Sequence, residues 1–350
     1  MGDNLIQGVL NLGINKVETP HNVKLTSAEM GNLWTLFMND TLSICSLGHF
    51  LSHVEDEQIR SVLEFAMTLA KAHVEKLKSF FNEEQIPIPY GFSEQTDRIQ
   101  GAPRLFTDDF YLFYIQNVGK IGLEGYTFAL ENTGRLDVCE YFTECLNESA
   151  RLLNKATELM LSKGGFLRPP YIPTPKNVEY AHREGYLAGW FGGRRPLNAV
   201  EISNIYLGLI QNQLGRTLIM GFSQVAKSKS VRDYFVRGRD IADKHVEVFG
   251  SILGKEFLPS ASSWSTEPTD STVPPFSDKL MMFHVTALNA AGIGHYGRSL
   301  GTSPRHDLGV AFTRLTADIA AFADDGAKIM IENGWLELPP SAVDRNELAK

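Results

Sequence analysis

An internal repeat spans most of the sequence and constrains the fold more than any other feature. The stretch Ala70–Leu77, Ala-Lys-Ala-His-Val-Glu-Lys-Leu, recurs 172 positions later as Ala-Asp-Lys-His-Val-Glu-Val-Phe. Further matches run in the same order through both halves, first at an offset of 172 positions and then, after one loop, at 170. One change of offset inside a loop is typical of two diverged copies of a domain. The chain is therefore a tandem duplication.

Each copy shows the hydrophobic periodicity of long α-helices. In the first copy, apolar residues recur at spacings of three and four within residues 30–51, 59–80, 107–130 and 135–160. Thr26, followed three residues later by Glu29, predicts a capping box at the start of the first of these helices. The second copy repeats the pattern, so the sequence predicts an all-α protein with four long helices in each half.

The connection between the second and third helices is long in both copies. Residues 88–105 have no hydrophobic period and carry two prolines and two glycines. A connection of about twenty residues can reach roughly 60 Å when extended, whereas helices of this length are roughly 40 Å long, so it can run the whole length of a bundle. The neighbouring connections are short and predict antiparallel hairpins. We therefore expect two tandem ferritin-like four-helix bundles, each with a long crossover between helices two and three.

These features divide the chain into five expected segments. They are an N-terminal arm (1–24), a first bundle (25–168), a Pro-rich linker with a short helix (169–196), a second bundle (197–340) and a C-terminal tail (341–350). Large aromatic residues are seldom left exposed in loops. We expect the linker helix, over residues 179–191, to pack such residues against a bundle and to join the bundles into one rigid unit; they are Trp190, Phe191, Trp264 and Trp335.

Composition excludes several classes of partner. The chain has 350 residues, of which 43% are hydrophobic and 21% charged, enough for two ordinary globular cores. The net charge of -8, with no basic cluster beyond Arg194 and Arg195, argues against a nucleic-acid partner. Three cysteines indicate a reducing compartment. We see no signal-peptide pattern and no apolar run of the ~20 residues that a membrane helix needs, so we expect a cytoplasmic protein.

The repeated histidines predict a buried polar layer halfway along each bundle. In an antiparallel hairpin that turns near Asp56, His73 faces the level of Asp40, which lies on an otherwise apolar stripe. Its counterpart opposite His245 is Asn212. If the third helix runs parallel to the second, Glu124 comes near the same level in the first copy and His295 in the second.

Two roles for this layer remain open. The first is structural: hydrogen-bonded polar residues fix helix register, as single polar residues do in coiled coils. The second is a degenerate metal or ligand site in the first half, where two carboxylates and an imidazole could meet. The second half, with Asn212 and Gly294 in place of the carboxylates, should hold no metal. We assign no metal and no cofactor, and the layer is our candidate binding site.

Other motifs favour structural interpretations. Di-iron ferritin-like proteins use Glu-x-x-His on two helices, and the sequence has this motif once, at Glu179–His182 in the linker. His49 and His53 are four residues apart, a spacing that can serve a metal, but the facing helix offers no ligands there, so we expect packed histidines. Glycines at 119, 122 and 125 predict close helix approach; room for a small ligand is the alternative.

Four stretches of the second half resemble an uncharacterised family of spore-forming bacteria. They are Arg194–Asn198, Gly221–Val225, Phe276–Phe283 and Gly334–Pro340. Members of that family are tandem ferritin-like bundles, distantly similar to spore coat protein F. The resemblance implies the fold and transfers no catalytic residues.

The sequence therefore supports two hypotheses about function. The first is a non-enzymatic structural or interaction protein of sporulating cells, which rests on the missing ligand motifs and on the resemblance. The second is a metal-binding or small-molecule-binding ferritin-like protein or enzyme, which rests on analogy of fold. No reaction, partner or oligomeric state can be read from the residues.

Overall fold

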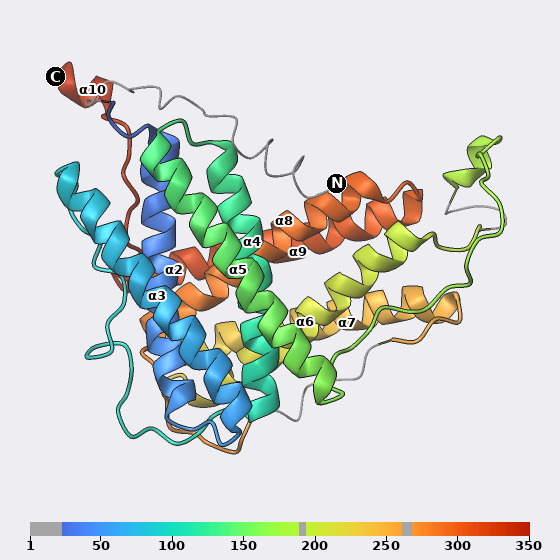
Figure 1. Ribbon diagram of the computed structural model, residues 1–350, viewed down its shortest axis with the longest axis horizontal. Coiled ribbons are helices and arrows are strands. Elements are labelled where there is room, and N and C mark those ends of the chain that lie inside the picture. Colours follow the sequence, from blue (N-terminus) through green and yellow to red (C-terminus); the bar gives the residue numbers. More distant parts are fainter. Residues whose placement is uncertain (1–22, 189–193, 261–267) are drawn as a thin grey trace, which may run out of the picture.

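A computed structural model describes residues 23–188, 194–260 and 268–350 (Figure 1). Within these ranges the protein is all-α, with nine α-helices, one 3-10 turn and two isolated β-bridges. The first half contains α2 (Ser27–Leu51), α3 (Glu57–Glu83), α4 (Asp108–Glu131) and α5 (Leu136–Ser162). The second contains α6 (Ala199–Val225), α7 (Lys229–Lys255), α8 (Asp278–Thr302) and α9 (His306–Glu332). The 3-10 turn η1 (Glu184–Tyr186) lies between the halves, and α10 (Arg345–Leu348) ends the chain. The tandem, all-α prediction is confirmed.

Side-chain caps explain where several helices begin. The predicted capping box is present at α2: the Glu29 amide donates to the Thr26 hydroxyl at 3.2 Å, and the Thr26 amide donates to the Glu29 carboxylate at 2.7 Å. Asn198 and Glu201 form the same box at α6. Thr107 caps α4, where its hydroxyl accepts a hydrogen bond of 3.4 Å from the Phe110 amide.

Hydrogen bonds between helix ends fix the direction of each helix. The Asp56 amide, in the turn between α2 and α3, donates to the Asp108 carboxylate at the start of α4 at 2.7 Å. The amides of Gly134 and Arg135, in the turn between α4 and α5, donate to the Glu29 carboxylate at the start of α2. Therefore α4 runs parallel to α3, and residues 84–107 cross from one end of the first half to the other. The second half has equivalent ties, Ser228 to Asp278 and Arg305 to Glu201.

The two halves share one apolar core. A central cluster includes buried side chains from α2 to α5 and from α6 to α9, while two further clusters lie within single halves. Helix pairs α2 with α8 and α4 with α6 carry the contact between halves. In Figure 1 the helices of the second half cross behind and beside those of the first. The halves are therefore joined through packed side chains as well as through the linker.

Contacts between the halves occur in reciprocal pairs. The Ile99 amide donates to the Pro275 carbonyl at 2.8 Å, and the Thr269 amide, 170 positions after Ile99, donates to the Leu105 carbonyl at 2.8 Å. The two β-bridges, Arg98 with Phe276 and Phe106 with Pro268, are related in the same way. Such reciprocity requires a pseudo-two-fold axis between the halves, as in a symmetric dimer.

The pseudo-two-fold axis passes through a contact between equivalent positions. The hydroxyl of Tyr114 shares a hydrogen bond of 3.0 Å with Nε2 of His284, which lies 170 positions later. Both side chains are buried, and the Phe222 ring packs against the imidazole. This contact joins one position in both halves, which is tyrosine in the first half and histidine in the second.

The linker differs from its prediction. Instead of a helix over residues 179–191, the described part forms only the turn η1, and residues 171–187 are exposed. A short helix needs packing against a neighbour to be stable, and the exposed residues 179–187 have none that would bury an apolar face. Trp335 packs against the central cluster, while Trp190, Phe191 and Trp264 lie outside the described residues. Among the described helices, none has the length and apolar character needed to cross a membrane.

Candidate functional site: a buried polar cluster in each half

Helix geometry brings five polar side chains together inside the first half. Cys145 and Glu148 are three residues apart on α5 and so point to one side of that helix. They face His73 on α3, with the remaining members on α2 and α4. We call this the first polar cluster; its members are Asp40, His73, Tyr126, Cys145 and Glu148.

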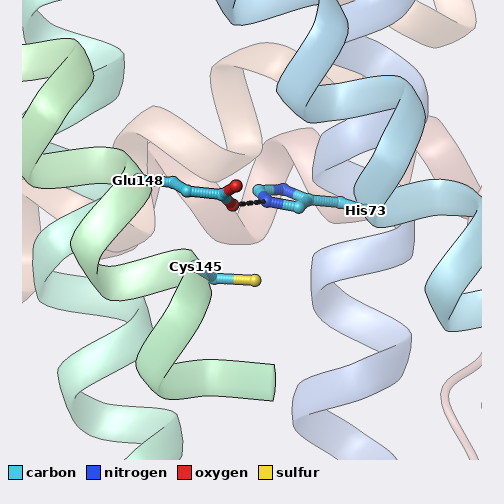
Figure 2. Close-up of side chains that lie close together, drawn as sticks. All are labelled: His73, Cys145 and Glu148. Atoms are coloured by element: carbon cyan, nitrogen blue, oxygen red, sulfur yellow. Dashed lines mark hydrogen bonds and ion pairs between the residues drawn. The ribbon is translucent and has the colours of Figure 1, made fainter. Parts of the chain in front are cut away.

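The imidazole of His73 is the centre of the first polar cluster. Its Nε2 lies 2.8 Å from the Glu148 carboxylate, and Figure 2 shows these two side chains pointing at each other with Cys145 beside them. On the other edge of the ring, Nδ1 lies 3.3 Å from the Tyr126 hydroxyl and 3.6 Å from the Asp40 carboxylate. His73 is 7% exposed, so nearly all of these contacts are shielded from water.

The surroundings of His73 favour its charged form. Burial lowers the pKa of the imidazole, but the nearby Asp40 carboxylate and Cys145 thiol outweigh that effect and raise the pKa to about 11. Burial also raises the pKa of the Asp40 carboxyl, and the nearby His73 imidazolium opposes that rise. One imidazolium is thus shared among more acceptors than it can satisfy, and one Asp40 oxygen has no hydrogen-bond partner.

The second half carries a different version of the same cluster. We call it the second polar cluster; its members are Asn212, His245, Tyr296 and Asp318. Nδ1 of His245 lies 3.1 Å from the Tyr296 hydroxyl, and the Asn212 amide donates to that hydroxyl at 2.6 Å. Nε2 lies 3.6 Å from Asp318, which accepts a closer hydrogen bond of 2.7 Å from Lys244.

Burial keeps the imidazole of His245, at the centre of the second polar cluster, in its neutral form. His245 has no exposed surface, and burial lowers the pKa of its imidazole to about 4 because Asp318 only partly offsets the loss of water. A cavity of about 80 Å³ adjoins it, lined by Asn212, Asn289 and Tyr296 among apolar side chains. A water molecule has a share of about 30 Å³ in the liquid, so this space suits water or a very small neutral molecule.

The structure brings together most, but not all, of the sequence-predicted residues. It places Asp40 beside His73, and it connects Asn212 to His245 through Tyr296. His295 is buried on α8, where its Nε2 lies 3.4 Å from the Ser299 hydroxyl and it takes no part in the contacts of His245 described above.

The placement of Glu124 corrects the prediction. Glu124 is exposed and forms an ion pair with Arg298 of the second half at 3.1 Å. Residue counts along the helices predict how far along the bundle Glu124 lies, but not the direction of its side chain. That side chain points away from α3. Two positions later, Tyr126 points inward.

Sequence reasoning missed Tyr126, Cys145 and Glu148. The repeat carried a signal for two of them, because Tyr126 matches Tyr296 and Glu148 matches the acidic Asp318 at the 170-position offset. The i, i+3 spacing of Cys145 and Glu148 was a second signal. Neither reveals which helix faces α3, and that depends on the packing of α5 against α3.

His49, near the end of α2, and His53, in the turn after it, are packed as expected. His49 is 2% exposed, burial lowers the pKa of its imidazole to about 3, and its ring lies 5.4 Å from that of Phe276. Nε2 of His53 lies 2.9 Å from the Ala102 carbonyl. These two imidazole rings therefore contact both crossovers: His53 that of the first half and His49 that of the second half.

The residues do not fit a ferritin-like di-iron centre. That centre needs Glu-x-x-His on two helices, with inward carboxylates on the other two. The positions three before His73 and His245 are Ala70 and Ala242, and Glu179–His182 lies in the exposed linker. The first polar cluster therefore belongs to another chemical type, with one imidazole, one thiol and two carboxylates.

Comparison with known proteins identifies the family but not an activity. The model of the family described as "Protein of unknown function (DUF3231)" matches residues 15–178 and again residues 186–348. Among curated proteins, none matches this chain. A solved structure described as "a putative spore coat protein" from Bacillus halodurans C-125 aligns with a TM-score of 0.40 and 16% identity, over 43% of this chain and 98% of that chain. The two family matches coincide with the two halves of the repeat, and together they cover nearly all of the sequence. The chain therefore belongs to the DUF3231 family of proteins of unknown function and contains two tandem matches to it.

Proposed function

We propose that this protein is a non-enzymatic structural or interaction protein whose working unit is the pair of halves held together as one rigid body. The central apolar cluster, continuous between the halves, is the observation that carries this proposal. Reciprocal hydrogen bonds from residues 99 and 269 support it, because they tie both crossovers to the opposite half. A surface built across both halves would then keep a fixed shape for a partner.

Within this proposal, each half is a ferritin-like four-helix bundle with a crossover between its second and third long helices. The segments 25–168 and 197–340 are the two bundles, joined by the linker 169–196. The parallel course of α3 and α4 supports this topology. The bundles serve as scaffolds, since the residues that would hold two iron ions are not there.

Cleavage of the linker tests whether the halves form one body. We would replace the exposed residues 176–181 by a site for a specific protease and cleave the native protein. The two fragments should stay together in gel filtration, eluting with the uncleaved control, because the shared core is untouched. Separation into two stable fragments would contradict the proposal. A charge placed at the axis, Tyr114→Asp, should promote dissociation of the cleaved protein, while the exposed Tyr171→Asp should not.

We further propose that the protein acts in sporulating cells. The resemblance of residues 194–198, 221–225, 276–283 and 334–340 to an uncharacterised family of spore-forming bacteria supports this role. In a spore-forming host, a fluorescent fusion should accumulate during sporulation, and deletion of the gene should alter the spore coat or spore resistance. Normal coats and normal resistance in the deletion strain would count against this role.

A further inference from the structure

Three metal-ligand side chains of the first half point into one small space. One potential ligand atom from each of His73, Cys145 and Glu148 lies within 4.8 Å of the other two. Figure 2 shows that the imidazole enters this space from α3, whereas the thiol and the carboxylate enter it from α5. The helices that carry these donors pack directly against each other. Neither the scaffold role nor the di-iron pattern uses this group.

We propose that the first half binds one divalent transition-metal ion, of the kind exemplified by Zn²⁺ and Co²⁺, through Nε2 of His73, Sγ of Cys145 and the carboxylate of Glu148. The inference goes beyond the proposed scaffold function and does not depend on it. On binding, the metal replaces the protons of the thiol and the imidazolium, which pass to solvent.

The donor set has the chemistry of a zinc-type site. Zinc takes thiolate sulfur at about 2.3 Å and imidazole nitrogen or carboxylate oxygen at about 2.0–2.2 Å, in tetrahedral geometry. Donors around such an ion are roughly 3.3–3.8 Å apart, as follows from those bond lengths. The present 2.8 Å contact between His73 and Glu148 is shorter, so the Glu148 side chain must turn outward slightly to admit the ion. Three protein donors leave a fourth position for water.

The other edge of the His73 ring is already oriented for this task. Metal-bound histidines commonly donate their second N–H to a carboxylate or another acceptor, which fixes the ring and strengthens the ligand. Nδ1 of His73 lies 3.3 Å from the Tyr126 hydroxyl and 3.6 Å from Asp40. The unpartnered oxygen of Asp40 faces this edge of the ring. With a metal on Nε2, that oxygen would stabilise the more positive imidazole and hold its orientation.

Charge in the first polar cluster also favours a cation. Two carboxylates face one imidazole, and in the part of the chain that the structure describes no lysine or arginine forms an ion pair with Asp40 or Glu148. The Glu148 side chain is 18% exposed, which gives an ion a path from solvent.

The second half keeps the histidine and an acidic residue, His245 and Asp318, but lacks the thiol and the second carboxylate. Leu315 stands 170 positions after Cys145, and Asn212 stands 172 positions after Asp40. Lys244 occupies the position of Ala72 and places its ammonium 2.7 Å from Asp318, where the first half would hold its ion. The second half therefore serves as an internal control. We expect one ion per chain, bound in the first half.

Titration with Co²⁺ tests the proposal. Full-length protein without a polyhistidine tag is treated with chelator and titrated with Co²⁺, and bound metal is counted by equilibrium dialysis. We expect one equivalent per chain, with visible d–d bands and a thiolate-to-cobalt charge-transfer band in the near ultraviolet. Cys145→Ser should abolish the charge-transfer band, and Glu148→Gln should weaken binding. Asp40→Asn should weaken binding by roughly 10–100-fold, as for other residues that orient a metal-bound histidine.

Matched variants of the second half are the controls. His245→Ala and Asp318→Asn should bind one equivalent of Co²⁺ with unchanged affinity and spectrum. His73→Ala should abolish binding, and His73→Gln replaces it if the alanine variant unfolds. Circular dichroism of every variant verifies that its helices are folded. Absence of Co²⁺ binding by the folded wild-type protein would overturn the proposal. So would a charge-transfer band that survives in Cys145→Ser, or loss of binding in the second-half variants.

Discussion

His73 and His245 occupy equivalent positions in the two halves, yet their surroundings favour opposite charge states. The pKa of His73 is raised to about 11, because the nearby Asp40 carboxylate and Cys145 thiol outweigh the effect of burial. The pKa of His245 is lowered to about 4, because burial dominates and the nearby Asp318 pairs with Lys244. The two halves thus keep the histidine but differ in its neighbours. These differences leave the imidazole charged in the first half and neutral in the second.

Removal of the His73 imidazole should destabilise the metal-free protein. In His73→Ala, the buried Asp40 carboxylate loses its positive neighbour, and we expect a loss of roughly 1–3 kcal/mol in the free energy of unfolding. Urea denaturation in the presence of a chelator measures this loss. His182→Ala, in the exposed linker, is the control and should leave the midpoint unchanged. An unchanged midpoint in His73→Ala would show that the cluster contributes nothing to stability.

At the scale of the helices, glycine has different effects at two positions of α4. A Cβ added at Gly119 would lie 3.1 Å from the backbone of Leu153 on α5, so close approach explains this glycine. A Cβ added at Gly125 would meet nothing within 4 Å. The predicted close approach therefore holds at position 119 and not at position 125.

This contrast gives a paired prediction for the helix α4. Gly125→Ala should stabilise the protein by up to about 1 kcal/mol, because alanine restricts the unfolded chain and favours a helix. Gly119→Ala should destabilise it, since α5 must move away from its methyl group. Thermal unfolding of both variants measures the two signs. Equal stabilisation by both substitutions would contradict the packing of α4 against α5.

Buried glutamates tie the ends of helices together. Glu29 is 1% exposed, caps α2 and accepts the amides of Gly134 and Arg135. Burial tends to raise the pKa of Glu29, but these backbone hydrogen bonds together lower it. Its contribution to stability is therefore present above the unfolded pKa, near 4.5, and is lost as pH falls through the lower folded pKa.

Glu29→Gln should therefore cost stability in a pH-dependent way. At pH 7 we expect a loss of roughly 1–3 kcal/mol, because a charged acceptor of three amides is removed. The difference from the wild type should shrink below pH 4.5, where the unfolded wild-type chain takes up a proton. Urea denaturation at several pH values measures this, with the exposed Glu131→Gln as the control. A difference independent of pH would rule out the charge as its cause.

At the scale of the whole molecule, the buried His284 at the pseudo-two-fold axis makes the contact between the halves sensitive to acid. Burial lowers the pKa of His284 to about 4, below the unfolded value of 6.5. Stability from the neutral imidazole is complete above about pH 6.5 and is lost progressively as pH falls towards 4. Each unit of pKa difference corresponds to about 1.4 kcal/mol, so the loss reaches roughly 3 kcal/mol.

His284→Phe should remove this part of the acid sensitivity. At pH 7 the variant should be less stable than the wild type, because the buried Tyr114 hydroxyl loses its partner. As pH falls from 7 to 4, the wild type should lose more stability than the variant, and the two curves should converge. Urea denaturation across this range measures the convergence, and His182→Phe should run parallel to the wild type. Parallel curves for His284→Phe would show that His284 does not titrate between the folded and unfolded states.

The sequence by itself determined the duplication, the eight long helices and their order. These follow from local chemistry: the period of apolar residues places the helices, and residues such as Thr26 and Thr107 cap them. The level of Asp40 opposite His73 also followed, because a short turn fixes the register of an antiparallel hairpin.

Only the tertiary structure decided how helices from different hairpins face each other. The rotation of a helix about its own axis depends on packing, so Glu124 turned outward, and Cys145 and Glu148 turned towards His73. The shared core and the contact between Tyr114 and His284 depend on how the halves dock, which no local pattern records. Periodicity identifies the apolar face of a helix, but the side chains that meet across that face are selected by the packing of the whole molecule.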